Sequence, residues 1–430
     1  MRDDWKRNIA LFLGSQTISL FGSALVQYAI TWYITLTTQS GAMMTISIVC
    51  GFLPTFFLSP FAGVWADRYN RKWLIVLSDA LIATATLIMA LLFMSGHGSL
   101  WLLFAISAIR ALGGGVQQPA VGAILPDIVP MEQLTRVNAI NGSIQSLVTL
   151  VSPMVAGTLL SMASIETIFF IDVVTAAVAI VTMLTLVRVK VHAKAQQAQS
   201  LSYFADMRQG FAYIGGHAYL KRFLAFCAAL FLLSAPAAFL TPLQVTRSFG
   251  EDVWRLTAIE VAFSGGMLVG GSLMAAWGGF RNRVHTMALA CVTMGACTLG
   301  LGVVPSFWVY LALMGLFGIA MPFFNTPAIV LVQEKVEADL LGRVFGVFGM
   351  ISSSMMPLGM LVFGPLADVV PIELLLVGTG ALILLITFFL VGNRVLVAAG
   401  KPAAQVTASP AAPSGSAPGT PGSARPDPQP

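Results

Sequence analysis

Apolar segments of about 20 residues recur along almost the whole chain and are separated by short polar segments. Each apolar segment is long enough to cross a bilayer as an α-helix. The segments are continuously apolar and lack the strict alternation of barrel strands, so they predict helices. The twelve expected helices occupy residues 8–36, 42–65, 73–95, 99–124, 137–162, 166–188, 219–246, 255–278, 285–304, 307–332, 342–366 and 372–396. The pattern therefore predicts an all-α polytopic membrane protein.

The composition supports this class and excludes others. Hydrophobic residues make up 57% of the chain and charged residues 10%, whereas a soluble domain is about 25% charged. The four cysteines lie inside apolar segments and show neither metal-ligand spacing nor the spacing of a disulfide framework. The chain has no H-E-x-x-H, G-x-S-x-G or P-loop motif. We therefore expect no metal site, no cofactor, no enzymatic activity and no self-contained ATP-driven transport.

The basic residues indicate how the helices are oriented. Lys and Arg accumulate on the cytoplasmic side of membrane proteins. With twelve helices and an inside N-terminus, 20 of the 23 basic residues fall in cytoplasmic segments, while Arg247 and Arg255 fall outside and Arg110 lies within a helix. A count wrong by one helix would remove this asymmetry. We expect both termini in the cytoplasm.

The two halves of the chain resemble each other. Pro119 matches Pro327 at an offset of 208 residues, and Arg136 matches Arg343 at an offset of 207. An offset of half the chain, spanning six helices, indicates a parallel repeat of two six-helix bundles with a binding site between them. The expected parts are an N-terminal bundle at 1–189, a cytoplasmic linker at 190–217, a C-terminal bundle at 218–397 and a disordered cytoplasmic tail, rich in Pro, Ala, Ser and Gly, at 398–430.

A ten-residue loop, Gly63 to Lys72, concentrates charge between the second and third expected helices. Its charged residues are Asp67, Arg68, Arg71 and Lys72. They can pair with each other, with helix ends or with lipid phosphates. Gly63 would let two helices approach closely, and Asn70 would tolerate a left-handed turn. Taken alone, the loop could also serve only to fix the orientation of the chain.

Several segments resemble those of a known family. The loop resembles the G-x-x-x-D-R-x-G-R-R/K signature of the major facilitator superfamily, with Asn70 in place of the second glycine. The segment from Ser152 through Pro153 to Gly157 is similar to the antiporter motif G-P-x-x-G-G of that family, with Ser and Ala replacing two glycines. The segments 51–54, 278–280, 332–335 and 341–345 are similar to the macrolide-efflux branch of drug:proton antiporters. The resemblance covers about Trp5 to Asn393 and implies the major facilitator fold, two pseudo-symmetric six-helix bundles, and a monomer.

The resemblance also implies a cytoplasmic latch. Its members would be Gly63, Asp67, Arg68, Arg71, Lys72 and Asp127. Asp67 would meet the N-terminal dipole of the eleventh helix, and Arg71 would reach Asp127 at the end of the fourth. Such a latch holds the bundles together on the inside and favours the outward-facing state. The equivalent loop of the second half, residues 278–283, lacks the Asp, so we expect one latch rather than two.

Four charged side chains lie at least five residues from either end of an expected helix, where charges are costly and mark functional positions. Arg110 lies about 16 Å into the fourth helix, near the bilayer centre, in a segment that resembles the family's fourth-helix motif, in which an arginine assists proton transfer. Burial favours the neutral form of a carboxyl group and water entry the charged form, so Asp79, Asp172 and Glu260 are candidate proton carriers. The resemblance favours Glu260 as the proton carrier, because its helix would border the central cavity. Asp79 would instead be a fixed ion-pair or hydrogen-bond partner near the cytoplasmic side. The alternatives are a structural Arg110 held by carbonyls and a fixed aspartate, and an interfacial Glu260.

A path for amphipathic substrates should be apolar with a few polar groups. Residues of this kind are Gln16, Gln27 and Trp32 in the first helix, Phe231 and Phe239 in the seventh, and Phe323, Phe324 and Asn325 in the tenth. Each could equally serve packing or lipid contact.

Together these features predict a proton-coupled antiporter that exports amphipathic small molecules, macrolide-like antibiotics first, while two rigid bundles rock about a central site. The expected partners are the substrate, protons and the lipid of a bacterial inner membrane, without nucleic acid. An acidic cargo would require more cations along the path than Arg110 alone, so neutral or cationic cargo is favoured. The alternatives are export of a siderophore or lysolipid by the same fold, and an uncoupled facilitator, which would not depend on a proton gradient.

Overall fold

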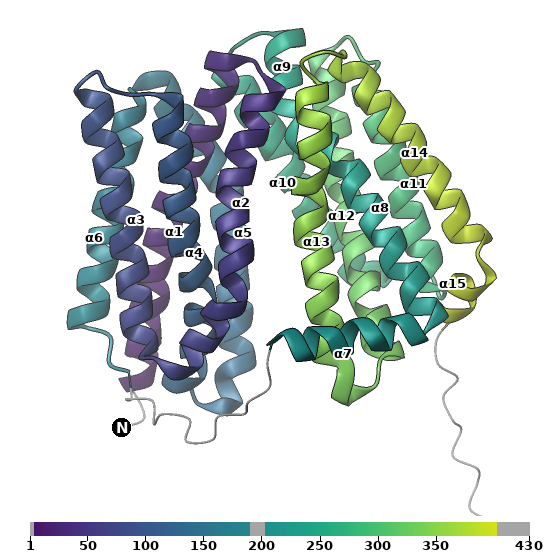
Figure 1. The fold of residues 1–430 in the computed structure, drawn as a ribbon, viewed down its shortest axis with the longest axis horizontal. Helices are drawn as coiled ribbons and strands as arrows, with labels where there is room; N and C mark the ends of the chain where they lie inside the picture. Colours follow the sequence, from purple (N-terminus) through teal and green to yellow (C-terminus); the bar gives the residue numbers. More distant parts are fainter. Residues whose placement is uncertain (1–3, 190–202, 402–430) are drawn as a thin grey trace, which may run out of the picture.

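The computed structural model describes residues 4–189 and 203–401, and this part of the chain contains helices and no strands. The first bundle consists of α1 (Asp4–Thr38), α2 (Gly41–Arg68), α3 (Arg71–Met94), α4 (Leu100–Ile128), α5 (Met131–Met162) and α6 (Ile165–Thr185). The second consists of α8 (Ala218–Phe239), α9 (Thr241–Phe249), α10 (Val253–Trp277), α11 (Arg283–Leu301), α12 (Phe307–Lys335), α13 (Ala338–Leu366) and α14 (Ile372–Gly392). The two bundles stand side by side (Figure 1).

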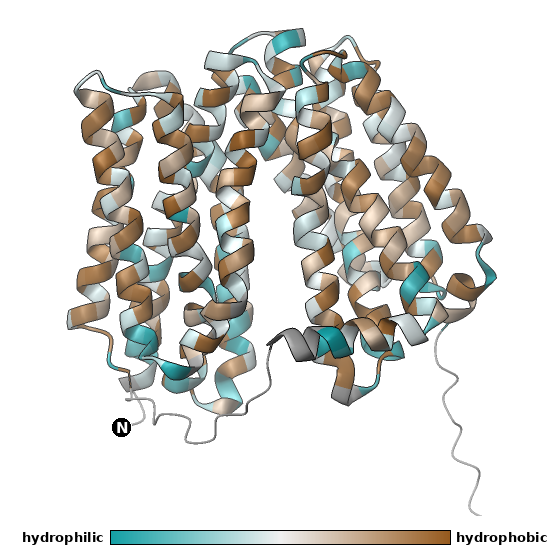
Figure 2. Cartoon of the chain, viewed as in Figure 1, coloured by the Kyte–Doolittle hydropathy of each residue, from teal (hydrophilic) through white to brown (hydrophobic). Residues whose placement is uncertain are grey.

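Twelve segments of the described chain are long and apolar enough to cross a membrane, as the sequence pattern predicts. Large apolar side chains such as Phe57, Trp101 and Phe388 are exposed on the outer surfaces. Figure 2 shows hydrophobic residues along the length of both bundles and hydrophilic residues gathered toward their ends. Such a surface requires lipid around it, because exposing it to water would cost a large free energy. The chain is a multi-pass membrane protein.

The seventh expected helix is divided into α8 and α9. Pro242 lies in the first turn of α9. Proline lacks the amide hydrogen that would continue α8, and its ring excludes the carbonyl group four residues before it. The short helix α9 lies at one end of the molecule, which we call the α9 end. The opposite end, the α7 end, carries α7 (Tyr203–Gly216) and α15 (Arg394–Ala399) (Figure 1).

The expected linker and tail are partly ordered. Helix α7 packs against α13, and residues 190–202 of the linker lie outside the described residues. The expectation that the tail is disordered from residue 398 is wrong as far as Lys401. The backbone amide of Arg283 is the first of α11 and has no acceptor within that helix. It donates to the carbonyl of Gly400 over 3.0 Å and so fixes this segment. Residues 402–430 lie outside the described part of the chain.

The two bundles meet at the α9 end. Gly41 of α2 lies so close to Gly364 of α13 that a Cβ on either would collide with atoms across the contact. One turn further, Thr45 donates from its hydroxyl to the Met360 carbonyl over 3.0 Å. Helix α5 meets α10 where Gly157 lies against Thr257. In Figure 1 the bundles converge near α9 and diverge toward α7. The structure is therefore closed at the α9 end.

Candidate functional site

A buried ion pair lies inside the first bundle. Nη1 of Arg110, on α4, is 2.5 Å from Oδ2 of Asp172, on α6. The Arg110 side chain is 9% exposed and that of Asp172 is fully buried. Thr86 of α3 donates to Asp172 over 3.0 Å and accepts a hydrogen bond from Arg110, while Ser23 of α1 donates to Asp172 over 3.2 Å. Four helices therefore converge on one charge pair.

A glycine makes this convergence possible. A Cβ at Gly22 would collide with Asp172 and Thr175, so α1 can lie directly on α6 only because residue 22 has no side chain. Ser23 reaches the carboxylate as a consequence, and its own carbonyl accepts from Arg110 Nη2 over 3.3 Å. The sequence shows Gly22 but gives no sign that it faces Asp172.

The Asp79 carboxyl group lies apart from this pair, between α3, α1 and α4. Its Oδ1 accepts from Ser19 over 2.9 Å and from Gln117 over 2.6 Å. Its Oδ2 is buried without a hydrogen-bond partner among the described residues, as is Nε2 of Gln16, one turn before Ser19. Asp79 thus has two donors on neighbouring helices and no cation.

The Glu260 carboxyl group lies at the contact between the bundles. It is on α10, seven residues after the helix begins, which is about 10 Å along the axis. No hydrogen bond or ion pair joins it to another described residue. Across the contact it lies within electrostatic range of the hydroxyl of Tyr28 on α1, and Tyr28 packs on Trp32 with ring centroids 5.5 Å apart. The structure does not bring Glu260 together with Arg110, Asp172 or Asp79, which lie inside the first bundle.

The antiporter-motif segment of α5 also lies at this contact. Ser152 and Pro153 are buried, and Gly157 lies against Thr257 of α10 and Trp32 of α1. A side chain at residue 157 would push α5 away from both helices. The Ser152 hydroxyl has no partner among the described residues.

A polar track on α5 leads toward Ser152 and was missed in the sequence. Asn138, Asn141, Gln145 and Thr149 recur at three- or four-residue spacing, and all but the half-buried Asn141 are exposed. Ile140, Leu147 and Met154 are exposed on the opposite face of the helix, where they suit lipid. A polar face at membrane depth is tolerated only beside water or protein. The track therefore faces the space between the bundles, open toward the α7 end.

A face of small residues on α13 borders the same space. Gly342, Gly346, Gly349 and Ser353 are exposed, and none of the three glycines has a neighbour where its Cβ would stand. Gly364 lies on this same face six turns further and touches α2. This face of α13 contacts the first bundle at the α9 end. Toward the α7 end its glycines border open space.

A set of polar contacts fastens the α9 end, and we call it the clasp. It consists of Gln39, Ser40, Arg247, Glu251 and Asp368, and Gln39 donates from its side-chain amide to the Glu251 carboxylate. The Asp368 carboxylate accepts from Ser40 Oγ over 2.8 Å and from the amides of Gly41 and Ala42 over 2.7 and 2.9 Å. Arg247 donates to Asp368 over 3.1 Å and also to the Gln39 carbonyl. A carboxylate of the second bundle thus caps the N-terminus of α2, a helix of the first.

Charge on Asp368 strengthens the clasp. Burial alone would raise the pKa of Asp368, but the hydrogen bonds from Ala42, Gly41, Ser40 and Arg247 outweigh burial and hold this pKa below its ordinary value. Because this pKa is lowered, the contribution of Asp368 to the stability of the clasp is fully present at pH values above the ordinary carboxyl pKa. It is lost only as the pH falls through the lowered pKa.

We expect Asp368→Asn to open the α9 end. The asparagine side chain is neutral, so it accepts hydrogen bonds from Ser40, Gly41 and Ala42 more weakly than the carboxylate does. It also no longer attracts the Arg247 guanidinium. Spin labels on His97→Cys and Val303→Cys, in loops of the two bundles at this end, should report longer distances in Asp368→Asn. The distances in the parent protein should not change between about pH 5 and 8.

Asp252→Asn is the matched control, because Asp252 lies at the same end but pairs with Arg255 of its own bundle over 3.2 Å. Unchanged distances in Asp368→Asn, or an equal opening in Asp252→Asn, would show that Asp368 does not fasten the bundles.

The loop from Gly63 to Lys72 holds the first bundle together at the α7 end. Nη1 of Arg71 is 2.7 Å from Oδ2 of Asp127, as the resemblance implies. Lys72 donates from Nζ to the carbonyls of Leu184 and Val187 over 3.2 and 2.8 Å, and so caps the end of α6. Arg68 is exposed. The side chains of Asp67, Ala338 and Asp339 lie outside the described part, so the expected contact of Asp67 with α13 is not described.

Two expectations about this loop are corrected. Asn70 does not adopt a left-handed turn: its φ is −66°, and its side chain accepts from the Lys72 amide as the N-cap of α3. An N-cap requires extended backbone, and asparagine is among the best N-cap residues. A Cβ on Gly63 would meet no atom within 4 Å, so Gly63 makes no close helix contact while the molecule is closed at the α9 end.

The second bundle repeats part of this arrangement. Arg283, at the start of α11, donates from Nε to Glu334 Oε2 over 3.0 Å. Asn282 caps α11 as Asn70 caps α3. Glu334 follows Asp127 by 207 residues, so the ion pair is the counterpart of Arg71–Asp127. The 207-residue offset of the repeat thus aligns the two acids, whereas Arg71 and Arg283 are 212 residues apart and fall outside it.

The expected substrate-path residues are divided between core and open space. Trp32, Phe231 and Phe324 are buried, and Phe324 packs on Phe231 with centroids 6.0 Å apart. Gln27 is exposed, and Phe239, Phe323 and Asn325 are half-buried. In this arrangement Gln27 is the most accessible of the set, whereas the three buried aromatics form packing contacts. No cluster of metal-ligating side chains occurs among the described residues.

Comparison with known proteins gives matches over most of the chain. Residues 12–360 match the model of the Major Facilitator Superfamily. Macrolide efflux protein A of Streptococcus pyogenes is 29% identical over 386 residues, which cover 89% of this chain and 95% of that protein. Macrolide efflux protein A of Enterococcus faecalis is 30% identical over 323 residues, which cover 74% of this chain and 100% of that protein. A solved structure of a variant of the nucleoside transporter NupG shares the fold, with a TM-score of 0.67, 17% identity, and coverage of 88% of this chain and 99% of that one.

Proposed function

Because this chain belongs to the major facilitator superfamily of transporters, we propose that it is a proton-coupled antiporter that exports amphipathic small molecules, macrolide-like antibiotics first. The observation that carries the proposal is Glu260. Its carboxyl group lies within the membrane at the contact between the bundles and has no partner among the described residues. An unpaired charge there is costly, so the group takes up a proton when the contact excludes water and releases it when water enters. Rocking of the bundles changes that access.

The space between the bundles supports amphipathic cargo. The α5 track offers amide and hydroxyl groups, and the α13 face offers glycines with room beside them. Arg110 is engaged by Asp172 and presents no free cation to this space. A neutral or cationic substrate therefore suits the path better than an acidic one. The relatives named macrolide efflux protein A lead us to test macrolides first.

Alternating access is supported by the geometry of α2 and α13. Gly63 follows Gly41 by 22 residues, and Gly364 follows Gly342 by 22, so each pair lies about six turns apart on one face of its helix. Gly41 and Gly364 touch, while a Cβ on Gly63 or Gly342 would meet no atom within 4 Å. We infer that closure of the α7 end brings Gly63 toward the start of α13 and lets Asp67 cap that helix, as Asp368 caps α2 here. The α7 end would then be closed and the α9 end open.

The test is efflux of a radiolabelled macrolide from energised cells, with and without a protonophore. The proposal predicts export that the protonophore abolishes. Export that resists the protonophore would make the protein a facilitator. No macrolide export at all would refute the proposed cargo and direct the screen to siderophores and lysolipids.

A further inference from the structure

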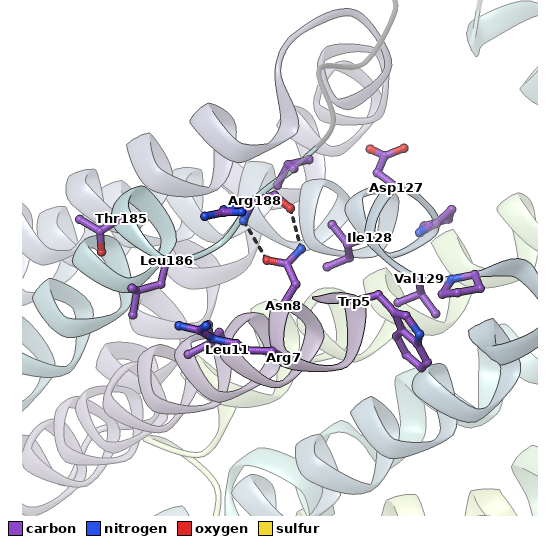
Figure 3. A pocket seen from close by; sticks show the side chains of 13 residues that line it. Trp5, Arg7, Asn8, Leu11, Asp127, Ile128, Val129, Thr185, Leu186 and Arg188 are labelled. Atoms are coloured by element: carbon purple, nitrogen blue, oxygen red, sulfur yellow. Dashed lines mark hydrogen bonds between the residues drawn. The ribbon is translucent and has the colours of Figure 1, made fainter. Parts of the chain in front are cut away.

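A cavity outside the central path lies at the α7 end of the first bundle. Its volume is about 660 Å³, and it is formed by the start of α1, the connection between α4 and α5, and the end of α6. Figure 3 shows Arg7 and Arg188 toward the α6 side of the cavity, near Leu186, and Trp5 and Val129 on the other side. No residue of the charged loop (Gly63 to Lys72) or of the α5 track lines this cavity.

The cavity has a fixed framework. Asn8 donates from Nδ2 to the Arg188 carbonyl over 2.6 Å and accepts from the Arg188 amide over 2.8 Å, as Figure 3 shows. Lys72 holds the end of α6 through the Leu184 and Val187 carbonyls. All of these residues belong to one bundle. The cavity therefore keeps its shape when the two bundles move.

The cavity carries unbalanced positive charge. Arg7 and Arg188 line it and have no acidic partner among the described residues. The acidic residue that lines it, Asp127, is already paired with Arg71. The side chains of Asp3 and Asp4 lie outside the described residues. An anion is thus the complementary ligand.

An apolar strip on α6 leads from the membrane into the cavity. Val174, Val178 and Val181 are 60%, 45% and 58% exposed and recur at three- or four-residue spacing on one face. Thr185, one turn beyond Val181, lines the cavity together with Leu186, which is 47% exposed. This strip faces lipid along the outside of the bundle. A ligand that fills the cavity and continues along the strip needs an anionic head and an apolar tail.

We propose that the cavity binds the headgroup of an anionic phospholipid from the adjacent leaflet, with its phosphate between Arg7 and Arg188 and an acyl chain along Val174, Val178 and Val181. Two free guanidinium groups prefer a lipid of net negative charge over a zwitterionic one, in which repulsion of the headgroup cation offsets attraction of the phosphate. The site depends on the membrane location of the chain and not on the proposed cargo.

Native mass spectrometry of the purified full-length protein tests the site. Phosphatidylglycerol and phosphatidylcholine with identical acyl chains serve as probes. We expect one phosphatidylglycerol to bind at least ten times more tightly than phosphatidylcholine. The Arg7→Gln/Arg188→Gln variant should weaken phosphatidylglycerol binding about 30-fold, the factor that corresponds to about 1 kcal/mol for each arginine, and should leave phosphatidylcholine binding unchanged.

Two further variants separate the site from general charge and from folding defects. Arg281→Gln/Arg394→Gln removes two exposed arginines from the α7 end of the other bundle and should not alter lipid preference. Thr185→Trp fills the cavity without changing charge and should also weaken phosphatidylglycerol binding. Equal binding of the two lipids, or an equal loss in the Arg281→Gln/Arg394→Gln variant, would overturn the proposal. Displacement of the lipid by inorganic phosphate at equal concentration would show instead a site for a soluble anion.

Discussion

Asp172→Asn is expected to destabilise the first bundle by about 3–5 kcal/mol, because it leaves the buried Arg110 guanidinium without its counter-charge. Thr86 and Ser23 also lose the carboxylate to which they donate. Unfolding in mixed micelles, followed by circular dichroism, measures the loss. As a matched control, Arg283→Gln breaks a pair whose members are about one-third exposed, and it should cost less than about 1 kcal/mol.

The variant Arg110→Met/Asp172→Leu separates structure from transport. Replacing both members of a buried pair by apolar residues of similar volume often restores stability. We therefore expect the double variant to unfold much later than Asp172→Asn. If the pair also takes part in proton movement, export stays low despite the recovered stability. Full export by the double variant would show that Arg110 and Asp172 have only a structural role.

Glu260→Gln is expected to reduce macrolide export about tenfold or more, because glutamine keeps the size and polarity of the side chain but cannot exchange a proton. The substitution removes no hydrogen bond or ion pair among the described residues, so melting temperature and macrolide binding should stay at parental values. Efflux from energised cells and binding to the purified protein measure the two effects.

Glu166→Gln serves as the matched control, since Glu166 lies in the first turn of α6 at the same end of the molecule but outside the bundle contact. Normal export by Glu260→Gln would move the proton site to Asp79 or Asp172. A fall in melting temperature equal to the fall in export would indicate that Glu260 serves packing.

The sequence predicts the membrane helices well because length and apolarity alone determine whether a segment can cross a bilayer. It does not predict the clasp, because Arg247, in α9, and Asp368, in the connection between α13 and α14, are 121 residues apart and only folding brings them together. The α5 track was visible in the spacing of Asn138, Asn141 and Gln145. A prediction based on charged and aromatic residues does not include it, because its residues are polar and uncharged.

The aromatic residues and the glycines show a second limit of prediction from the sequence. Trp32 and Phe324 are as apolar as a cavity lining should be, but packing demands the same property, and both are buried. Gly63 suits a close helix contact, but that contact depends on which end of the molecule is closed. A sequence pattern does not specify which of two arrangements a transporter occupies. Asn70 illustrates a different ambiguity, because asparagine suits both a left-handed turn and a helix N-cap.

The central claim, exchange of an amphipathic substrate for protons, is tested most directly with the purified protein in proteoliposomes, where an imposed pH gradient is the only energy source. The account predicts that a radiolabelled macrolide accumulates on the more acidic side, that reversing the gradient reverses the direction, and that Glu260→Gln abolishes the accumulation. Equal macrolide distributions with and without the gradient would contradict it.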